Sequence, residues 1–172
     1  MFDTIGGLPL HPLVVHAVEV VVPAAALTVL VAAFWPRFRR WAFALPLLLA
    51  LGAVALVPVA TESGEALKER VGEPPLVEVH AEMAEGLLPW VIGLLVVAVG
   101  LTWWTWQERR SAGAGSPGGV PRWVVPVVMV GALVAAGGTT YEAIRIGHSG
   151  ATAVWGPLVE STTVSDDDDD DG

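Results

Sequence analysis

Four long apolar runs dominate this sequence and limit what it can fold into. They cover residues 13–35, 41–60, 87–106 and 123–144, and each is close to the ~20 residues that span about 30 Å of hydrocarbon. Hydrophobic residues make up 53% of the chain and charged residues only 16%, which is too apolar for an ordinary soluble domain. The sequence therefore predicts an all-α, polytopic membrane protein, folded as a four-transmembrane-helix bundle.

The arginines indicate how the four spans are oriented. Six of them lie in the loops after the first and third spans: Arg37, Arg39, Arg40, Arg109, Arg110 and Arg122. Short loops rich in Lys and Arg stay in the cytoplasm, and Trp residues, which favour the membrane interface, gather at the same ends of the spans. We therefore expect an N-out/C-out topology, with both termini on the outer side of the membrane.

The segments outside the spans are too short for a second folded domain. Residues 1–156 are predicted to form a single four-helix membrane domain. The final stretch, residues 157–172, holds an uninterrupted aspartate run at 166–171, and such like-charged runs repel and stay extended. We therefore expect a disordered acidic tail, and a function located in the bundle or at its outer mouth.

All four histidines fall on the outer side in this topology. His11 and His16 stand at the start of the first span, His80 precedes the third span, and His148 follows the fourth. Neutral imidazoles ligate Zn, Cu and Fe, including haem iron, and a four-helix bundle often holds a cofactor between facing helices. His16 and His80 are predicted as the first-choice ligands, on inward faces at similar depth, with His11 and His148 as alternatives.

Other polar residues near the histidines would tune such a centre by hydrogen bonds to its ligands. Glu19 lies three residues after His16 and hence on the same helix face, and Tyr141 and Arg145 belong to the end of the fourth span. A structural interpretation stays open beside this one. His16 and Glu19 could pair with each other, or Glu19 with Arg145, as polar contacts that hold helices together.

The residue types narrow the chemistry of a bound centre. The chain has no cysteine, which excludes thiolate ligands, disulfides and covalently attached haem. It also lacks the Glu-x-x-His pairs of ferritin-like di-iron bundles. The string GHSGA at residues 147–151 is no nucleophile elbow, because it follows a membrane helix rather than a strand. The cofactor hypotheses are therefore haem b, another His-ligated transition metal, or none, and the sequence identifies no catalytic residue.

Four sequence blocks together resemble one known family. They are HPLVVH at residues 11–16, TESGEALKERV at 61–71, VEVHAEMAEG at 77–86 and GHSGATAVWG at 147–156. In this order they are similar to the DUF2231 family of predicted four-helix prokaryotic membrane proteins, and the resemblance extends from about Leu10 to Gly156. It implies a multi-pass protein of the prokaryotic cytoplasmic membrane, whose recurrent histidines correspond to His11, His16, His80 and His148.

The resemblance also implies redox chemistry. Some members are similar in architecture to small haem-binding membrane cytochromes, and some are fused to Rieske-type domains. The chain departs from the family where relatives place Phe-Pro after the second histidine, since Ala17 and Val18 follow His16 here. The surroundings of His16 therefore differ from the family pattern.

Together these observations predict a small integral membrane protein for redox or electron transfer, with its centre near the outer leaflet. Its expected partners are the lipid bilayer and a membrane or extracytoplasmic redox protein, with no nucleic acid. The alternative is a non-catalytic scaffold or accessory subunit whose His/Glu cluster is structural. Ion conduction ranks third, because the cytoplasmic halves of the spans hold no ionisable residue to continue a path.

The expected topology predicts a labelling pattern. Ser116→Cys, in the loop after the third span, should resist a membrane-impermeant thiol reagent in intact cells, because that loop should face the cytoplasm. Ser161→Cys, after the fourth span, should react. The chain has no native cysteine, so the labelled position is unambiguous. The reverse pattern would contradict the topology and move the histidines to the cytoplasmic side.

Overall fold

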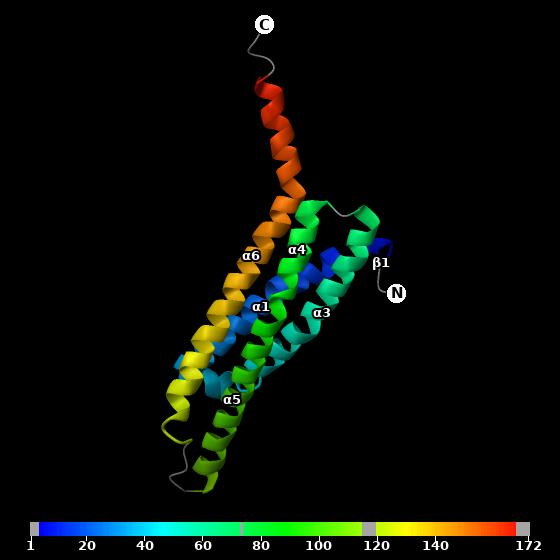
Figure 1. Ribbon diagram of the computed structural model, residues 1–172. Helices are drawn as coiled ribbons and strands as arrows, with labels where there is room; N and C mark the ends of the chain where they lie inside the picture. Colours follow the sequence, from blue (N-terminus) through cyan, green and yellow to red (C-terminus); the bar gives the residue numbers. More distant parts are fainter. Residues whose placement is uncertain (1–3, 73, 115–119, 168–172) are drawn as a thin grey trace.

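The computed structural model describes residues 4–72, 74–114 and 120–167, and this part of the chain is almost entirely helical (Figure 1). At the N-terminus, β1 (Thr4–Ile5) and β2 (Leu8–Pro9) form a small antiparallel hairpin. The helices that follow are α1 (Leu10–Phe34), α2 (Pro36–Ala42), α3 (Leu45–Val71), α4 (Pro75–Glu85), α5 (Leu87–Ala114) and α6 (Val124–Asp167).

Within the described residues, four helical stretches are long and apolar enough to cross a membrane. They are Leu10–Phe34, Leu45–Arg70, Pro75–Ala112 and Val124–Gly156. The predicted all-α fold with four membrane spans is therefore confirmed. Most of the helices run past the predicted ends of the apolar runs, because a helix satisfies its own backbone hydrogen bonds in lipid and in water alike.

Three local features were not predicted from the sequence. Residues 36–42 form the short helix α2, which has Pro36 at its first position, where the missing N–H costs nothing. The helices α4 and α5 are separated only at Gly86, whose N–H donates to the Met83 carbonyl (3.1 Å) three residues back. The backbone of α6 stays helical to Asp167, whereas we expected disorder from residue 157; the charge repulsion behind that expectation begins only at the aspartate run.

The bundle places α1 and α5 opposite each other, and each of them packs mainly against α3 and α6. Alanines supply much of the buried core, and six of them have 0% exposure: Ala25, Ala32, Ala50, Ala53, Ala98 and Ala132. Small side chains let helix backbones approach closely, which is how helices associate in lipid. Large apolar side chains such as Val20, Leu27 and Val96 point outward instead, more than 60% exposed, as expected for a protein surrounded by a bilayer.

Two glycines mark close helix contacts of different tightness. On α3, a Cβ added at Gly52 would lie 3.5 Å from Cγ1 of Val21 on α1, which is an ordinary contact. On α6, a Cβ added at Gly138 would overlap Cζ3 of Trp90 on α5, so the indole would have to move. The indole of Trp90 therefore rests directly on the backbone of α6.

This difference predicts unequal effects of two matched alanine substitutions. Gly138→Ala should lower the stability of the purified protein by about 1–3 kcal/mol, because Trp90 must leave its position to admit the methyl group. Gly52→Ala should change stability little. Thermal unfolding in the same detergent measures both variants. Equal midpoints for the two would contradict the tight Trp90 contact.

Candidate functional site

Polar side chains gather at both ends of the bundle. The end where α1 begins and α3 finishes carries the histidines, and we refer to it as the histidine end. The other end holds α2 and the C-terminal part of α5, and we refer to it as the arginine end.

His11, in the first turn of α1, contacts α3. Its Nδ1 lies 3.0 Å from the carbonyl oxygen of Ala60 and 3.4 Å from Oγ of Ser63, and Ser63 itself donates to the Ala60 carbonyl (3.1 Å). A carbonyl oxygen only accepts hydrogen bonds. The neutral ring of His11 therefore carries its proton on Nδ1 and leaves Nε2 with a free lone pair.

His80, on α4, makes the corresponding contact with α6. Its Nδ1 lies 2.9 Å from Oγ of Ser149, and that hydroxyl donates its own proton to the carbonyl of Ile146 (2.8 Å). Because the proton of Ser149 is engaged, its oxygen accepts from His80. The neutral ring of His80 is therefore also protonated on Nδ1 and free at Nε2.

Each of the two rings lies against a glycine of its partner helix. A Cβ added at Gly64 would lie 3.0 Å from Cε1 of His11, and one added at Gly150 would lie 3.0 Å from Cε1 of His80. The rings are also close enough to each other that their protonated forms would repel. The structure thus places His11 and His80 at the same end of the bundle, each against its own neighbouring helix and both half-buried.

The expected inward orientation of His16 is not observed. Its ring is exposed on the outer surface of α1, and its Nδ1 donates to the carbonyl of Pro12 on the same helix (2.5 Å). Five residues separate His11 from His16, which at 3.6 residues per turn places them on different helix faces. His11 lies about three turns before Val22 and about four turns before Ala25, so it shares the helix face of these two buried residues. This periodicity in the sequence favoured His11 over His16 as the inward-facing histidine.

The other predicted site residues lie away from this pair. Glu19 and His148 are exposed, and Tyr141 is 62% exposed. Arg145 pairs with Glu142 on its own helix (3.2 Å) and lies over the ring of Tyr141. No hydrogen bond or ion pair joins Glu19, Tyr141 or Arg145 to a histidine in the described part of the chain, so the expected tuning contacts are not made there.

The described residues also contain no group of three or more His, Asp or Glu side chains placed to hold a metal ion. A metal held by protein ligands alone normally takes at least three of them. The histidine end offers two imidazole nitrogens. The histidine end therefore suits a metal centre that needs only two ligands from the protein.

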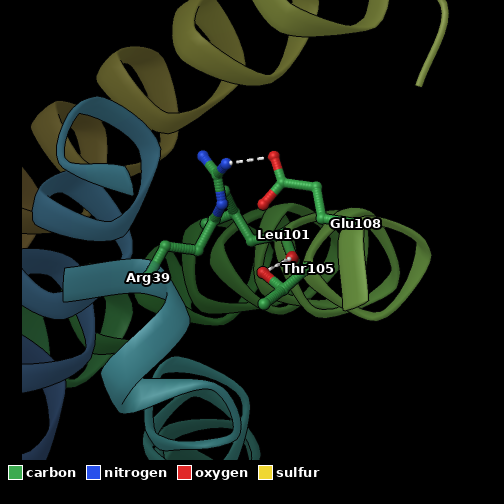
Figure 2. A network of polar contacts seen from close by, with 4 residues as sticks. All are labelled: Arg39, Leu101, Thr105 and Glu108. Atoms are coloured by element: carbon green, nitrogen blue, oxygen red, sulfur yellow. Dashed lines mark hydrogen bonds and ion pairs between the residues drawn. The ribbon is translucent and has the colours of Figure 1, made fainter. Parts of the chain in front are cut away.

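The arginine end holds a buried ion pair (Figure 2). Arg39 of α2 is 3% exposed, its Nη2 donates to Oε1 of Glu108 on α5 (2.8 Å), and its guanidinium lies 3.8 Å from the centre of the Trp104 ring. Burial lowers the pKa of Arg39, and the Glu108 carboxylate opposes that shift. In Figure 2, Thr105 bonds to the Leu101 carbonyl of its own helix and leaves Glu108 free for Arg39.

The buried pair predicts a large loss of stability when Glu108 is removed. Glu108→Ala should cost about 3–5 kcal/mol, because it leaves the buried Arg39 charge without a partner. The control is Glu65→Ala, which removes a partner of Lys68 (3.6 Å) from an exposed position and should cost at most about 1 kcal/mol. Thermal unfolding in detergent compares the two, and equal losses would contradict the role of Glu108.

Comparison with known proteins supplies the family. The family model described as a predicted membrane protein (DUF2231) matches residues 7–163. The chain belongs to the DUF2231 family. The match includes both histidine contacts, and it confirms the family that the sequence blocks indicated. No curated protein and no solved structure matches the chain, so for this DUF2231 protein the family establishes a membrane setting and the function is argued from the site.

Proposed function

We propose that this protein is a small membrane redox protein that binds a b-type haem through His11 and His80. The proposal rests on the tautomer and hydrogen bonding of the two imidazole rings. Both Nδ1 atoms are held by hydrogen bonds, which leaves both Nε2 atoms available as ligands. Histidines that ligate metals almost always donate their other ring N–H in this way, to a carbonyl, carboxylate or water.

The number of ligands favours haem over a bare metal ion. Haem iron takes four nitrogens from its macrocycle and needs only axial ligands from the protein, for which histidine is common. Two imidazoles meet that need, whereas no third histidine or carboxylate joins them among the described residues. A Zn or Cu ion would have to complete its coordination with water.

The surroundings suit a site reached from outside the cell. In the expected topology the histidine end faces the outer leaflet, because the arginine-rich loops lie at the opposite end. A bound haem would supply one-electron transfer, and the chain would fix its ligands and set its potential through burial and hydrogen bonding. The partner would then be a membrane or extracytoplasmic redox protein.

A scaffold function is the second candidate, and one observation favours it. Each histidine contact also joins two helices, His11 linking α1 to α3 and His80 linking α4 to α6. Polar contacts of this kind hold membrane helices together without any ligand. The two functions differ in whether the purified protein takes up haem.

The haem hypothesis predicts a visible spectrum. Protein purified in mild detergent, or reconstituted with haemin, should show a Soret band and sharp visible bands on reduction. His11→Ala and His80→Ala should abolish or shift these bands, because an axial imidazole sets the ligand field of the iron. His16→Ala and His148→Ala are the matched controls and should leave the spectrum unchanged, since both rings are exposed.

Two outcomes would contradict the hypothesis. A protein that stays colourless and binds no stoichiometric transition metal after reconstitution would leave the scaffold function. A spectrum lost with His16→Ala, but kept with His11→Ala, would place the centre elsewhere.

A further inference from the structure

The first span and the third carry the same pattern of residues at an offset of 69 residues. Identical residues correspond in several pairs: His11 and His80, Val22 and Val91, Trp35 and Trp104, Arg40 and Arg109. Inward-facing residues correspond as well: Ala25 and Leu94, Val29 and Ala98, and Ala32 and Leu101 are all at most 2% exposed. Corresponding faces of the two spans therefore point into the bundle, one on α1 and the other on α4 and α5.

The second span and the fourth correspond in the same way, through another constant offset. It takes Ala50 to Ala136, Gly52 to Gly138, Ala60 to Ile146, Ser63 to Ser149 and Gly64 to Gly150. Gly52, Ala60, Ser63 and Gly64 contact the first span, and Gly138, Ser149 and Gly150 contact the third. The correspondence therefore concerns the helix interfaces rather than composition alone.

Contacts between the helices repeat at corresponding positions. Val21 packs on Gly52 in the first half, and its counterpart Trp90 packs on Gly138 in the second. The ring of His11 meets Gly64, and that of His80 meets Gly150, each with a Cβ distance of 3.0 Å. Each serine also donates to the carbonyl three residues before it: Ser63 to Ala60 (3.1 Å) in the first half, and Ser149 to Ile146 (2.8 Å) in the second.

Some residues also meet their own counterparts across the bundle. Arg39 pairs with Glu108, and Arg109 donates to the carbonyl of Arg40, both at the offset of 69 residues. His11 and His80, which are also counterparts, both lie at the opposite end. In a two-fold arrangement a residue meets its own counterpart only near the axis, as at the centre of an isologous interface. The pseudo-two-fold axis therefore runs along the bundle between these pairs.

We infer that the chain is built from two equivalent helical hairpins, and that Ser63 and Ser149 are positioning residues that prepare His11 and His80 as the two halves of one ligand site on the axis. In secondary transporters built from repeats, the substrate site lies at the interface between the repeats. The identity of the ligand rests on the proposed haem function, whereas the positioning role does not. The two parts can therefore fail separately.

The first experiment tests positioning without any ligand. Nitrogen-15 NMR of the full chain, labelled at histidine and studied in detergent above the pH at which the rings titrate, reports the tautomer of each ring. We expect His80 to be protonated on Nδ1 and to shift toward the Nε2 form in Ser149→Ala. Ser149→Thr, which keeps a hydroxyl, should restore the Nδ1 form.

Thr152→Ala is the matched control for α6, because its hydroxyl bonds only to the His148 carbonyl of the same helix. It should leave the His80 signal unchanged. Ser63→Ala should change the His11 tautomer little, since His11 keeps the Ala60 carbonyl at 3.0 Å. An unchanged His80 tautomer in Ser149→Ala would overturn the positioning role.

The second experiment titrates the same variants with haemin. One shared site predicts one haem per chain, lost in His11→Ala and equally in His80→Ala, and bound about tenfold or more weakly in Ser149→Ala. If each single histidine variant keeps a bound haem, the two halves act independently and the shared site is overturned. If no haem binds while the tautomers behave as expected, the proposed function and the shared site fail together, and the positioning role stands.

Discussion

Hydrocarbon offers no hydrogen bonds, and this constraint orders the whole molecule. A polar group that enters the bundle costs free energy unless it finds a partner inside the protein. The hydroxyls of Thr28, Thr102 and Thr140 meet the constraint locally, each by donating to a carbonyl four residues back on its own helix. His11, His80 and Arg39 instead bond to groups on other helices. They therefore connect separate helices, and the polar residues that the bilayer would otherwise exclude become the contacts that fix how the spans meet.

The same solution is used twice in the chain. Each half pairs a histidine at one end with a carbonyl and a serine on the neighbouring span, and places a glycine beneath the ring. A glycine there lets the histidine ring approach the helix backbone. The ring is then held in place by the hydrogen bond of its Nδ1. The position of each ring is thus set by the helix interface itself, which is the rigid support that the proposed centre would need.

The architecture was accessible from the sequence because span length and hydropathy depend on local composition. The facing residues were harder to assign. To choose between His11 and His16, one must know which face of α1 points into the bundle. In the structure the buried Val22 and Ala25 mark that face, but in the sequence apolar residues occur on every side of the helix and hide it. The Arg39 and Glu108 pair could not be predicted from charge patterns, since arginines near Trp usually mark an interface with water. Its burial depends on α2 folding back against α5, which only the tertiary structure specifies.

A pseudo-two-fold axis places a condition on every residue that lies beside it. Two identical charges that face each other would repel there, and the position of the buried arginine avoids this by breaking the symmetry, with Arg39 in one half and Glu108 in the other. The identical counterparts Arg40 and Arg109 meet instead through a guanidinium and a backbone carbonyl. The histidine end keeps identical residues. Two imidazoles avoid this repulsion when both are neutral, and in that state each ring has one nitrogen with a free lone pair. The symmetry is therefore kept at the two histidines and broken at the one position where a buried arginine needs an opposite charge.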